Sequence, residues 1–371
     1  KPTWQDLFAR DHMPIDVIIS PELEVGRNVL RRLNVPGAFE IIDFADGQVQ
    51  VVGVSIEEDC PIIDTPLYQL TDLFPDLKTT VVGIVRNNTL FVPNSKDLFP
   101  DLKTTVVGIV PNSKDHMMVG DAVYFSSAKK DVQRTLSIFG HQEKEASRVI
   151  LVGGGNIGLY VAKELEKSQS GVRVKVIERD RKRAVFAADQ LKKTIVLNGD
   201  GLNPELLKEA GIKNTDTIIT LTNDDQANIL TCVLAKREGA ERALSLINNQ
   251  TYGPLMQSLG IDAFLNPRAT TVSHVLRHVR RGRIRGLQSV HDGAAEVIEA
   301  EALETSPLVG RPLKDVDLPN GILIGAVVRD KEVIVPRGHT EIAKGDRVII
   351  FAQSDMVRKV EQMFRVSLEF F

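Results

Sequence analysis

Short apolar runs rich in β-branched residues alternate with longer amphipathic stretches in the second half of the chain. The runs predict strands near 148–153, 172–178, 194–199, 215–222, 242–248 and 262–266. The stretches between them predict helices at 156–167, 181–193, 224–238 and 268–281. Because strand and helix alternate, we expect an α/β fold with a Rossmann-like, doubly wound parallel sheet.

The pattern changes near residue 286, where short β segments separated by turns replace the alternation. These segments are EVIEAEAL, GILIGAVV, EVIVPRG and DRVIIFA, and a final helix is predicted at 355–364. The sequence therefore predicts a small α+β lobe. A counterpart at 37–140 also ends in a predicted helix, AKKDVQRTLSIF.

The chain contains an internal duplication. IDVIISPELEVGRNVLRRL at 15–33 aligns with IDAFLNPRATTVSHVLRHV at 261–279, and Asp16 and Pro21 both recur 246 positions later. We expect two tandem units. The second is complete, and the first begins at the last strand and helix of a truncated Rossmann domain.

Four domain ranges follow from this alignment. They are 1–34 for the remnant of the first Rossmann domain, 35–143 for the first small lobe, 144–284 for the second Rossmann domain and 285–371 for the second lobe.

A second, exact repeat lies inside the first lobe. DLFPDLKTTVVGIV occurs letter for letter at 72–85 and at 97–110, and the offset between the two lobes falls from 243 to 225 positions across it. We infer a recent insertion of 98–115 or a sequence error. The extra piece is expected to loop out or to displace 73–90.

The main chemical signal is RVILVGGGNIG at 148–158, where an apolar run breaks into glycines. Gly153 permits a tight turn, Gly155 removes a side chain where backbone approaches a pyrophosphate, and Gly158 permits close packing of helix on sheet. The first N–H groups of the helix at 156–167 then face the anion. The pattern predicts a dinucleotide site.

Glu178 follows Gly158 by twenty positions and ends the second predicted strand, GVRVKVIE. A carboxylate at this point accepts hydrogen bonds from the adenosine ribose hydroxyls. It also repels a 2′-phosphate, by about 4 kcal/mol per charge pair at roughly 4 Å and an effective dielectric near 20. We therefore expect NAD(H) or an adenine nucleotide rather than NADP. The alternative is a Rossmann domain with a degenerate site.

Polar loops follow two further predicted strands. Asp200 and Gly201 follow the third strand, where they could border the adenine. Thr222 and Asn223 follow the fourth and could contact ribose or nicotinamide. Helix capping by Asn223 or Asp224 is an equal alternative.

Size and charge narrow the function classes. A chain of 371 residues with 43% hydrophobic and 26% charged residues is typical of a soluble protein of two to four domains. A net charge of −3 argues against a general nucleic-acid binder. One basic run, RHVRRGRIR at 277–285, could meet an acidic partner or anionic lipid, or be only a solvated helix face. No apolar run approaches the ~18–20 residues of a membrane span.

Motifs for catalysis or metal binding are not apparent. Cys60 and Cys232 have no ligand spacing and are read as packing residues, and the seven histidines are scattered. Hydride transfer commonly needs a positioned proton donor or acceptor beside the nicotinamide, and no convincing candidate is found. We expect no catalytic residue, no metal and no enzymatic activity, with an NAD-dependent dehydrogenase as the competing class.

The tandem plan, VGGGNIG at 152–158, Glu178, GDG at 199–201 and LTNDD at 221–225 together resemble the TrkA family. These are cytosolic regulatory subunits of bacterial Trk potassium-uptake systems, built from RCK (KTN) domains. The resemblance implies a homotetramer at the cytoplasmic face of the inner membrane, beneath a dimeric, membrane-embedded potassium-translocating subunit of the TrkH/TrkG type. It implies NAD(H) as ligand and, in some members, ATP or ADP.

Carried over by position, the resemblance gives these residues roles at the nucleotide. The phosphate loop comprises Gly153, Gly154, Gly155, Asn156, Ile157 and Gly158. Glu178 contacts the ribose, Arg179 a phosphate or base, and Asp200 with Gly201 the adenine edge, while Thr222 and Asn223 complete the candidate set.

The expected mechanism is a ligand-dependent conformational change of an RCK ring that gates potassium uptake. A gating ring of another potassium channel or antiporter is a further alternative. This chain departs from the family pattern in its truncated first Rossmann domain and its 18-residue insertion.

Overall fold

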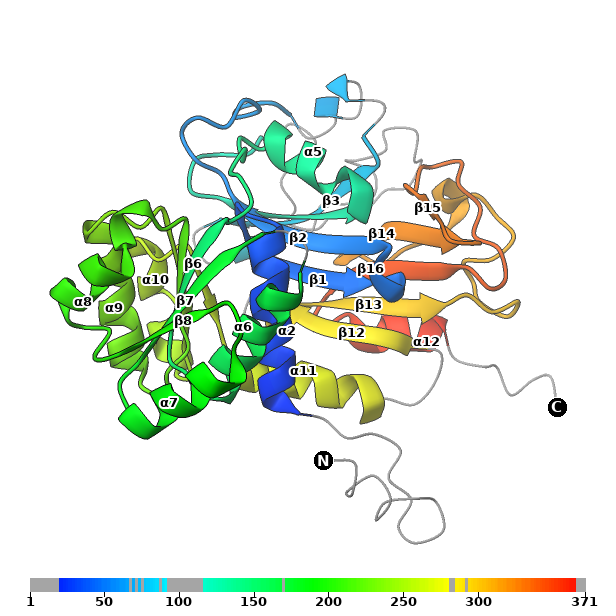
Figure 1. The fold of residues 1–371 in the computed structure, drawn as a ribbon. Helices are drawn as coiled ribbons and strands as arrows, with labels where there is room; N and C mark the ends of the chain where they lie inside the picture. Colours follow the sequence, from blue (N-terminus) through cyan, green and yellow to red (C-terminus); the bar gives the residue numbers. More distant parts are fainter. Residues whose placement is uncertain are drawn as a thin grey trace, which may run out of the picture.

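The computed structural model describes residues 20–66, 69–70, 73–74, 77–86, 89–91, 116–168, 171–279, 284–290 and 293–364. These residues form one parallel and two antiparallel sheets (Figure 1). Helix α2 (Pro21–Asn34) lies in the middle, with the parallel sheet on one side and the two antiparallel sheets on the other.

The parallel sheet contains the six predicted strands. They are β6 (Arg148–Val152), β7 (Arg173–Glu178), β8 (Ile195–Asn198), β9 (Thr217–Thr220), β10 (Arg242–Leu246) and β11 (Ala263–Leu265). Their spatial order is β11-β10-β9-β6-β7-β8. The order reverses between β6 and β9, so the carboxyl ends of these two strands border the crevice where ligands of doubly wound sheets bind.

The predicted helices of this sheet are present, with two short additions. The set is α6 (Asn156–Lys167), α7 (Arg181–Gln190), α8 (Pro204–Ala210), α9 (Asp225–Arg237), α10 (Leu255–Ser258) and α11 (Pro267–Val279). Helices α8 and α10 were not predicted from the sequence.

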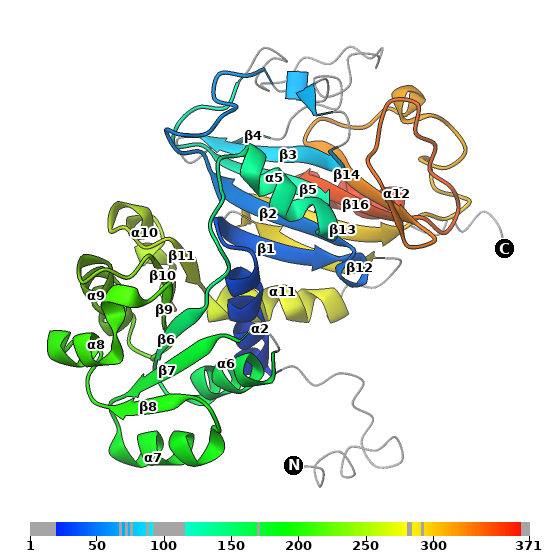
Figure 2. The same ribbon diagram turned by 45° about the horizontal axis from the view of Figure 1, so that its top comes forward.

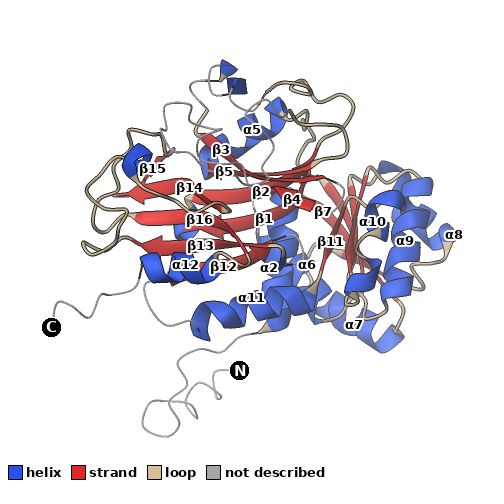
Figure 3. Cartoon of the chain, turned by 180° about the vertical axis from the view of Figure 1, so that it is seen from behind, coloured by secondary structure: helices blue, strands red, loops and turns tan. Residues whose placement is uncertain are grey.

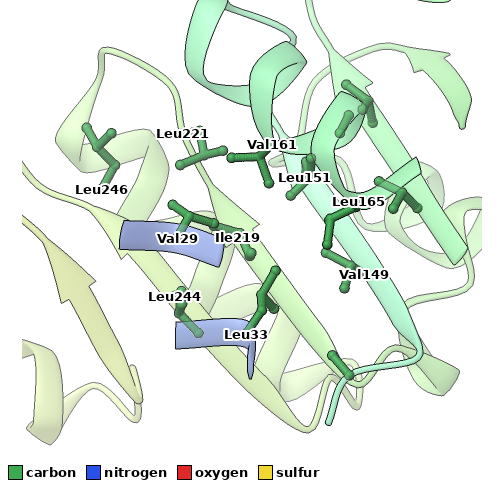
Figure 4. Packing of buried hydrophobic residues seen from close by; sticks show 14 of the residues in the cluster. Val29, Leu33, Val149, Leu151, Val161, Leu165, Ile219, Leu221, Leu244 and Leu246 are labelled. Atoms are coloured by element: carbon green, nitrogen blue, oxygen red, sulfur yellow. The ribbon is translucent and has the colours of Figure 1, made fainter. Parts of the chain in front are cut away.

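Helix α2 belongs by sequence to the first unit but packs on the sheet of the second. Val25, Val29 and Leu33 recur every four residues, so they lie on one face of the helix, and all three are buried. Figure 4 shows Val29 beside Ile219 and Leu33 near Leu244 of the parallel sheet. Burial of each side chain contributes about 2 kcal/mol.

Helices α2 and α11, which the duplication relates, lie against each other. Asn28 Nδ2 donates to Thr270 Oγ1 at 3.3 Å where they meet. Seen from behind, α11 continues past this contact toward β12 (Ile284–Val290) (Figure 3).

The two antiparallel sheets have the same topology. The first contains β1 (Ala38–Phe44), β2 (Val49–Ser55), β3 (Thr79–Arg86), β4 (Thr89–Phe91) and β5 (Ala122–Ala128), in the order β1-β2-β5-β3-β4. The second contains β12, β13 (Ala295–Glu301), β14 (Ile322–Arg329), β15 (Glu332–Ile334) and β16 (Arg347–Gln353), in the order β12-β13-β16-β14-β15. Equal orders are those expected of tandem copies.

Each small sheet is followed by a helical segment, as predicted. These are α5 (Val132–Ile138) after the first sheet and α12 (Val357–Met363) after the second. Short 3₁₀ turns lie at Ala45–Gly47, Lys129–Asp131, Ile212–Asn214, Gln250–Tyr252 and Leu313–Asp315.

The two small sheets pack face to face through a shared apolar core (Figure 2). Tyr124 of the first and Phe351 of the second have ring centroids 6.2 Å apart. Glycines sit at the register irregularities of β3 and β14. A Cβ on Gly83 would lie 3.0 Å from Phe351, and one on Gly325 would lie 3.0 Å from Ser126. The absence of these side chains permits the close approach of the sheets.

The repeated segment of the first lobe enters the sheet through its first copy. Residues 79–86 form β3, in the place that β14 takes in the second lobe. Of the two expected outcomes, displacement of 73–90 by the extra piece is therefore wrong for residues 79–86. The second copy, at 97–110, lies outside the described residues, and so does the predicted insertion 98–115.

The domain limits stay predictions, because the packing of α2 joins residues of both units in one core. Within the described ranges, no helix has both the length and the apolar character needed to cross a lipid bilayer.

Candidate functional site

The loop after β6 turns sharply at a glycine. Gly153 has φ of 111°, and a Cβ there would lie 3.1 Å from the backbone of Leu221. A Cβ on Gly158 would lie 1.9 Å from the carbonyl oxygen of Gly153. The packing of the loop itself therefore requires glycine at both positions.

Glu178 closes the loop from the end of β7. Its Oε2 accepts the N–H of Gly154 at 2.6 Å, and its Oε1 accepts the N–H of Asp180 at 2.8 Å. A Cβ on Gly154 would lie 3.2 Å from the Glu178 side chain, so this glycine also serves a contact within the protein. Hydrogen bonds to a carboxylate are among the strong ones, and they fix this negative charge beside the loop.

Gly155 differs from the other three glycines. It is the N-cap of α6, and a Cβ there would meet no protein atom within 4 Å. The next residues, Asn156 and Ile157, begin the helix, whose unpaired N–H groups and partial positive charge lie beside this open space. Helix N-termini of this kind bind phosphate groups through their backbone N–H groups.

Arg183 is part of this site, although it was absent from the predicted set. Its Nε donates to the carbonyl oxygen of Gly154 at 3.0 Å, and its Nη2 donates to Asn156 Oδ1 at 2.8 Å. The guanidinium also lies over the ring of Phe186, 5.1 Å from its centroid. The available signal was its position in the first turn of α7, at the same sheet edge as Glu178.

Asp200 and Gly201 follow β8 at this edge and have roles within the protein. Asp200 Oδ1 accepts the N–H of Leu202 at 2.9 Å, and a Cβ on Gly201 would lie 2.6 Å from Val152. The carbonyl oxygen of Arg179 accepts a hydrogen bond from a neighbouring side-chain amide at 3.1 Å. The ligand contacts of these residues stay predictions.

The loop after β9 is held by its own hydrogen bonds. Asp224 caps α9 by accepting an N–H of its first turn at 3.0 Å. Of the two candidate caps, the structure therefore has Asp224 and not Asn223, which is exposed. The hydroxyl of Thr222 donates to Oδ1 of the buried Asn228 at 2.6 Å. Asn228 was absent from the predicted set of site residues.

The loops after these four strands meet at one edge of the sheet. The N–H of Gly199 donates to the carbonyl oxygen of Glu178 at 3.0 Å, and a Cβ on Gly153 would lie 3.1 Å from the backbone of Leu221 and 3.2 Å from that of Thr222. The structure thus brings the predicted residues of all four loops together.

A separate cavity of about 1710 Å³ lies between α2, β1 and the β11 edge of the parallel sheet. None of its lining residues belongs to 153–158, and Glu178 does not line it. The cavity and the candidate site are therefore different places.

The cysteines are packing residues, as expected. Cys60 and Cys232 are both buried, and burial raises the pKa of the Cys232 thiol to about 12. The described ranges hold no group of three metal-binding side chains. Of the basic side chains in the run at 277–285, Arg285 is the one that the structure describes, and it is paired with Glu301.

Two family models match the chain: the TrkA-N domain over 149–267 and the TrkA-C domain over 297–365. The Trk system potassium uptake protein TrkA of Azorhizobium caulinodans is 54% identical over 371 residues, which cover 100% of this chain and 77% of that protein. The protein of the same name from Halomonas elongata is 38% identical, again with 100% and 77% covered.

Among solved structures, the crystal structure of the GsuK RCK domain aligns with 98% of this chain and 73% of its own, at 16% identity and a TM-score of 0.49.

Proposed function

Because the chain belongs to the family of Trk system potassium uptake proteins TrkA, we propose that it is a nucleotide-sensing regulatory subunit. In this role it binds NAD(H), or alternatively ATP or ADP, at the loop 153–158. Binding gates potassium movement through a separate, membrane-embedded subunit of the TrkH/TrkG type. The protein acts as a homotetramer on the cytoplasmic face of the inner membrane, and it is not an enzyme.

The observation that best supports nucleotide binding is the difference between Gly155 and the other three glycines of the loop in the space around them. A Cβ on Gly153, Gly154 or Gly158 would lie 3.1, 3.2 or 1.9 Å from other atoms of the protein. Gly155 alone would meet nothing within 4 Å. The protein's own packing therefore accounts for three of these glycines, and a ligand that approaches the backbone accounts for the fourth.

The remaining groups suit an adenine dinucleotide. The first turn of α6 supplies N–H groups for a pyrophosphate. The Glu178 carboxylate, at the end of the neighbouring strand β7, suits the ribose hydroxyls and opposes a 2′-phosphate. We therefore assign Glu178 to the ribose and NAD(H), rather than NADP, to the site.

Gating requires that the nucleotide bind two conformations of the protein with different affinities. A ligand with equal affinity for both would shift nothing. A coupling free energy of about 1–3 kcal/mol between sites is typical of such systems. Helix α2 directly connects the nucleotide loop with the first small lobe, since it contacts α6 and is followed in the chain by β1.

The test is a calorimetric titration with NADH, NAD⁺, ATP and ADP of the 371-residue chain and two variants, Gly155→Ala and Glu178→Ala. We expect tight binding of at least one nucleotide to the unsubstituted protein and its loss in Gly155→Ala, with an unchanged melting temperature. Glu178→Ala should weaken binding through the ribose contact. Light scattering should give a tetramer.

The same nucleotide should alter potassium flux in vesicles that contain the membrane subunit. Unchanged binding in Gly155→Ala would overturn the assigned site. Oxidation of NADH with a small-molecule substrate would instead support a dehydrogenase. Gating of a different channel or antiporter, with no effect on Trk-type uptake, would redirect the proposal to that partner.

A further inference from the structure

Helix α2 brings a carboxylate from the first unit to the phosphate loop of the second. Glu22 lies in the first turn of α2, and Asn156 is the first residue of α6. Asn156 Nδ2 points to Glu22 Oε1 at 3.4 Å, although 134 residues separate the two in sequence. The candidate site is therefore flanked by a charged group outside the 153–158 motif.

The backbone that carries Glu22 is held firmly. Gly26, one turn further along α2, lies so close to Tyr160 of α6 that a Cβ would come within 2.3 Å of the ring. Val25 and Val29 are fully buried in the same core as Val161. Although the Glu22 side chain is exposed, its charge remains near the start of α6 because the two helices are packed together.

Asn156 thus stands between two opposite charges. Arg183 donates to its Oδ1 at 2.8 Å, and Glu22 faces its Nδ2. The guanidinium favours an anion beside the first turn of α6, and the carboxylate opposes it. Each further phosphate charge that a ligand brings adds another repulsion from Glu22, because Coulomb energies add over charge pairs.

We propose that Glu22 selects ligands by their phosphate charge, favouring dinucleotides such as NAD(H) over nucleoside triphosphates. This inference rests on the proposed nucleotide function of the loop 153–158. The pyrophosphate of NADH carries about two negative charges and the triphosphate of ATP about four at neutral pH. Removal of the Glu22 charge therefore improves ATP binding more than NADH binding.

The experiment compares Glu22→Gln with the unsubstituted chain in calorimetric titrations with ATP and with NADH. In about 150 mM salt the dissociation constant should fall about tenfold for ATP and about threefold for NADH, as expected for roughly twice the repulsion. In about 500 mM salt both changes should shrink, because exposed charges are screened.

Glu164→Gln is the matched control. It removes the same charge from the exposed pair with Lys167, about 12 Å further along α6, a distance that exceeds a Debye length at physiological salt. It should leave the ratio of the ATP and NADH dissociation constants unchanged.

Three results would overturn the inference: an unchanged ratio in Glu22→Gln, an equal shift of the ratio in Glu164→Gln, or a shift that persists at the higher salt concentration. If NADH binding depends on Gly155 while the ratio does not depend on Glu22, the selection fails and the proposed function stands. If the unsubstituted chain binds no nucleotide, both fail together.

Discussion

Arg86 donates to both carboxylate oxygens of the buried Asp121, from Nε at 2.8 Å and from Nη2 at 2.7 Å. Arg329 and the buried Asp346 repeat this pair in the second lobe at the same two distances. In both lobes the carboxylate also accepts the N–H of the residue three positions before it, at 2.8 Å. The pair survives in the first lobe although the segment 98–115 lies between its two members.

We predict that Asp346→Ala lowers the free energy of unfolding by about 2 kcal/mol, because it removes the acceptor of the half-exposed Arg329 guanidinium and of the Ala343 N–H. The measurement is a calorimetric melting curve of the full chain. Glu304→Gln is the control, since it breaks the exposed pair with Lys344 in the same lobe. Its melting temperature should be unchanged, and equal effects of the two substitutions would contradict the prediction.

Deletion of 98–115 should leave the first lobe folded. The described strands of that lobe lie in residues before and after this segment, and they have the same order as those of the second lobe, which has no such insertion. We expect the deletion variant to keep or exceed the melting temperature of the full chain and to keep its nucleotide affinity. A large fall in melting temperature would mean that the segment contributes to the fold.

Gly158→Ala should destabilise the protein, whereas Gly155→Ala should not. The Cβ that Gly158→Ala introduces would overlap the carbonyl oxygen of Gly153, so the loop must shift, at a cost of about 2 kcal/mol. A Cβ at position 155 meets open space, so the melting curve of Gly155→Ala should match that of the unsubstituted chain. Denaturant titrations of the two variants side by side check this, and equal stability would count against the loop geometry.

The stability of the parallel-sheet core should fall in acid through Glu166. Partial burial opposes its ionisation, but N–H groups of Lys192, Lys193 and Thr194 donate to it and hold its pKa at about 2, below the ordinary 4.5. Because the folded pKa is the lower one, the stabilisation is present above pH 4.5 and is lost as the pH falls toward 2.

Glu166→Gln should therefore lower stability at neutral pH by about 1 kcal/mol, a value reduced for solvent screening. The difference from the unsubstituted chain should close between pH 4.5 and pH 2. Melting curves at a series of pH values measure this. A difference that stays constant over the whole acid range would rule out the carboxylate as its origin.

Periodicity predicted the elements of the parallel sheet well because each one is long or strongly apolar. The predicted strand at 148–153 and the observed β6 (Arg148–Val152) differ by one residue. Helix α8, PELLKEA, is too short for a helical period to stand out. The packing of α2 on the parallel sheet was not predictable from the sequence, since amphipathicity identifies the buried face of a helix but not the element that covers it.

In the candidate site, too, residues of a local motif were predictable and contacts between distant elements were not. Gly153, Gly155, Gly158 and Glu178 follow from a local motif, because strand, turn and helix fix their spacing. Arg183 and Glu22 reach the loop from α7 and α2, and no spacing in the sequence encodes those contacts. The Glu178 contact with the Gly154 N–H also depends on the pairing of β6 with β7.

Because α2 of the first unit packs on the sheet of the second, the chain cannot be cut at the linker 140–147 into two fragments that each fold alone. A piece beginning at 144 would lack Val25, Val29 and Leu33, and would expose an apolar trough on its sheet to water. The other piece would carry a helix whose apolar face has no support. The two units produced by the duplication therefore depend on each other, because each covers apolar surface that the other would expose to water.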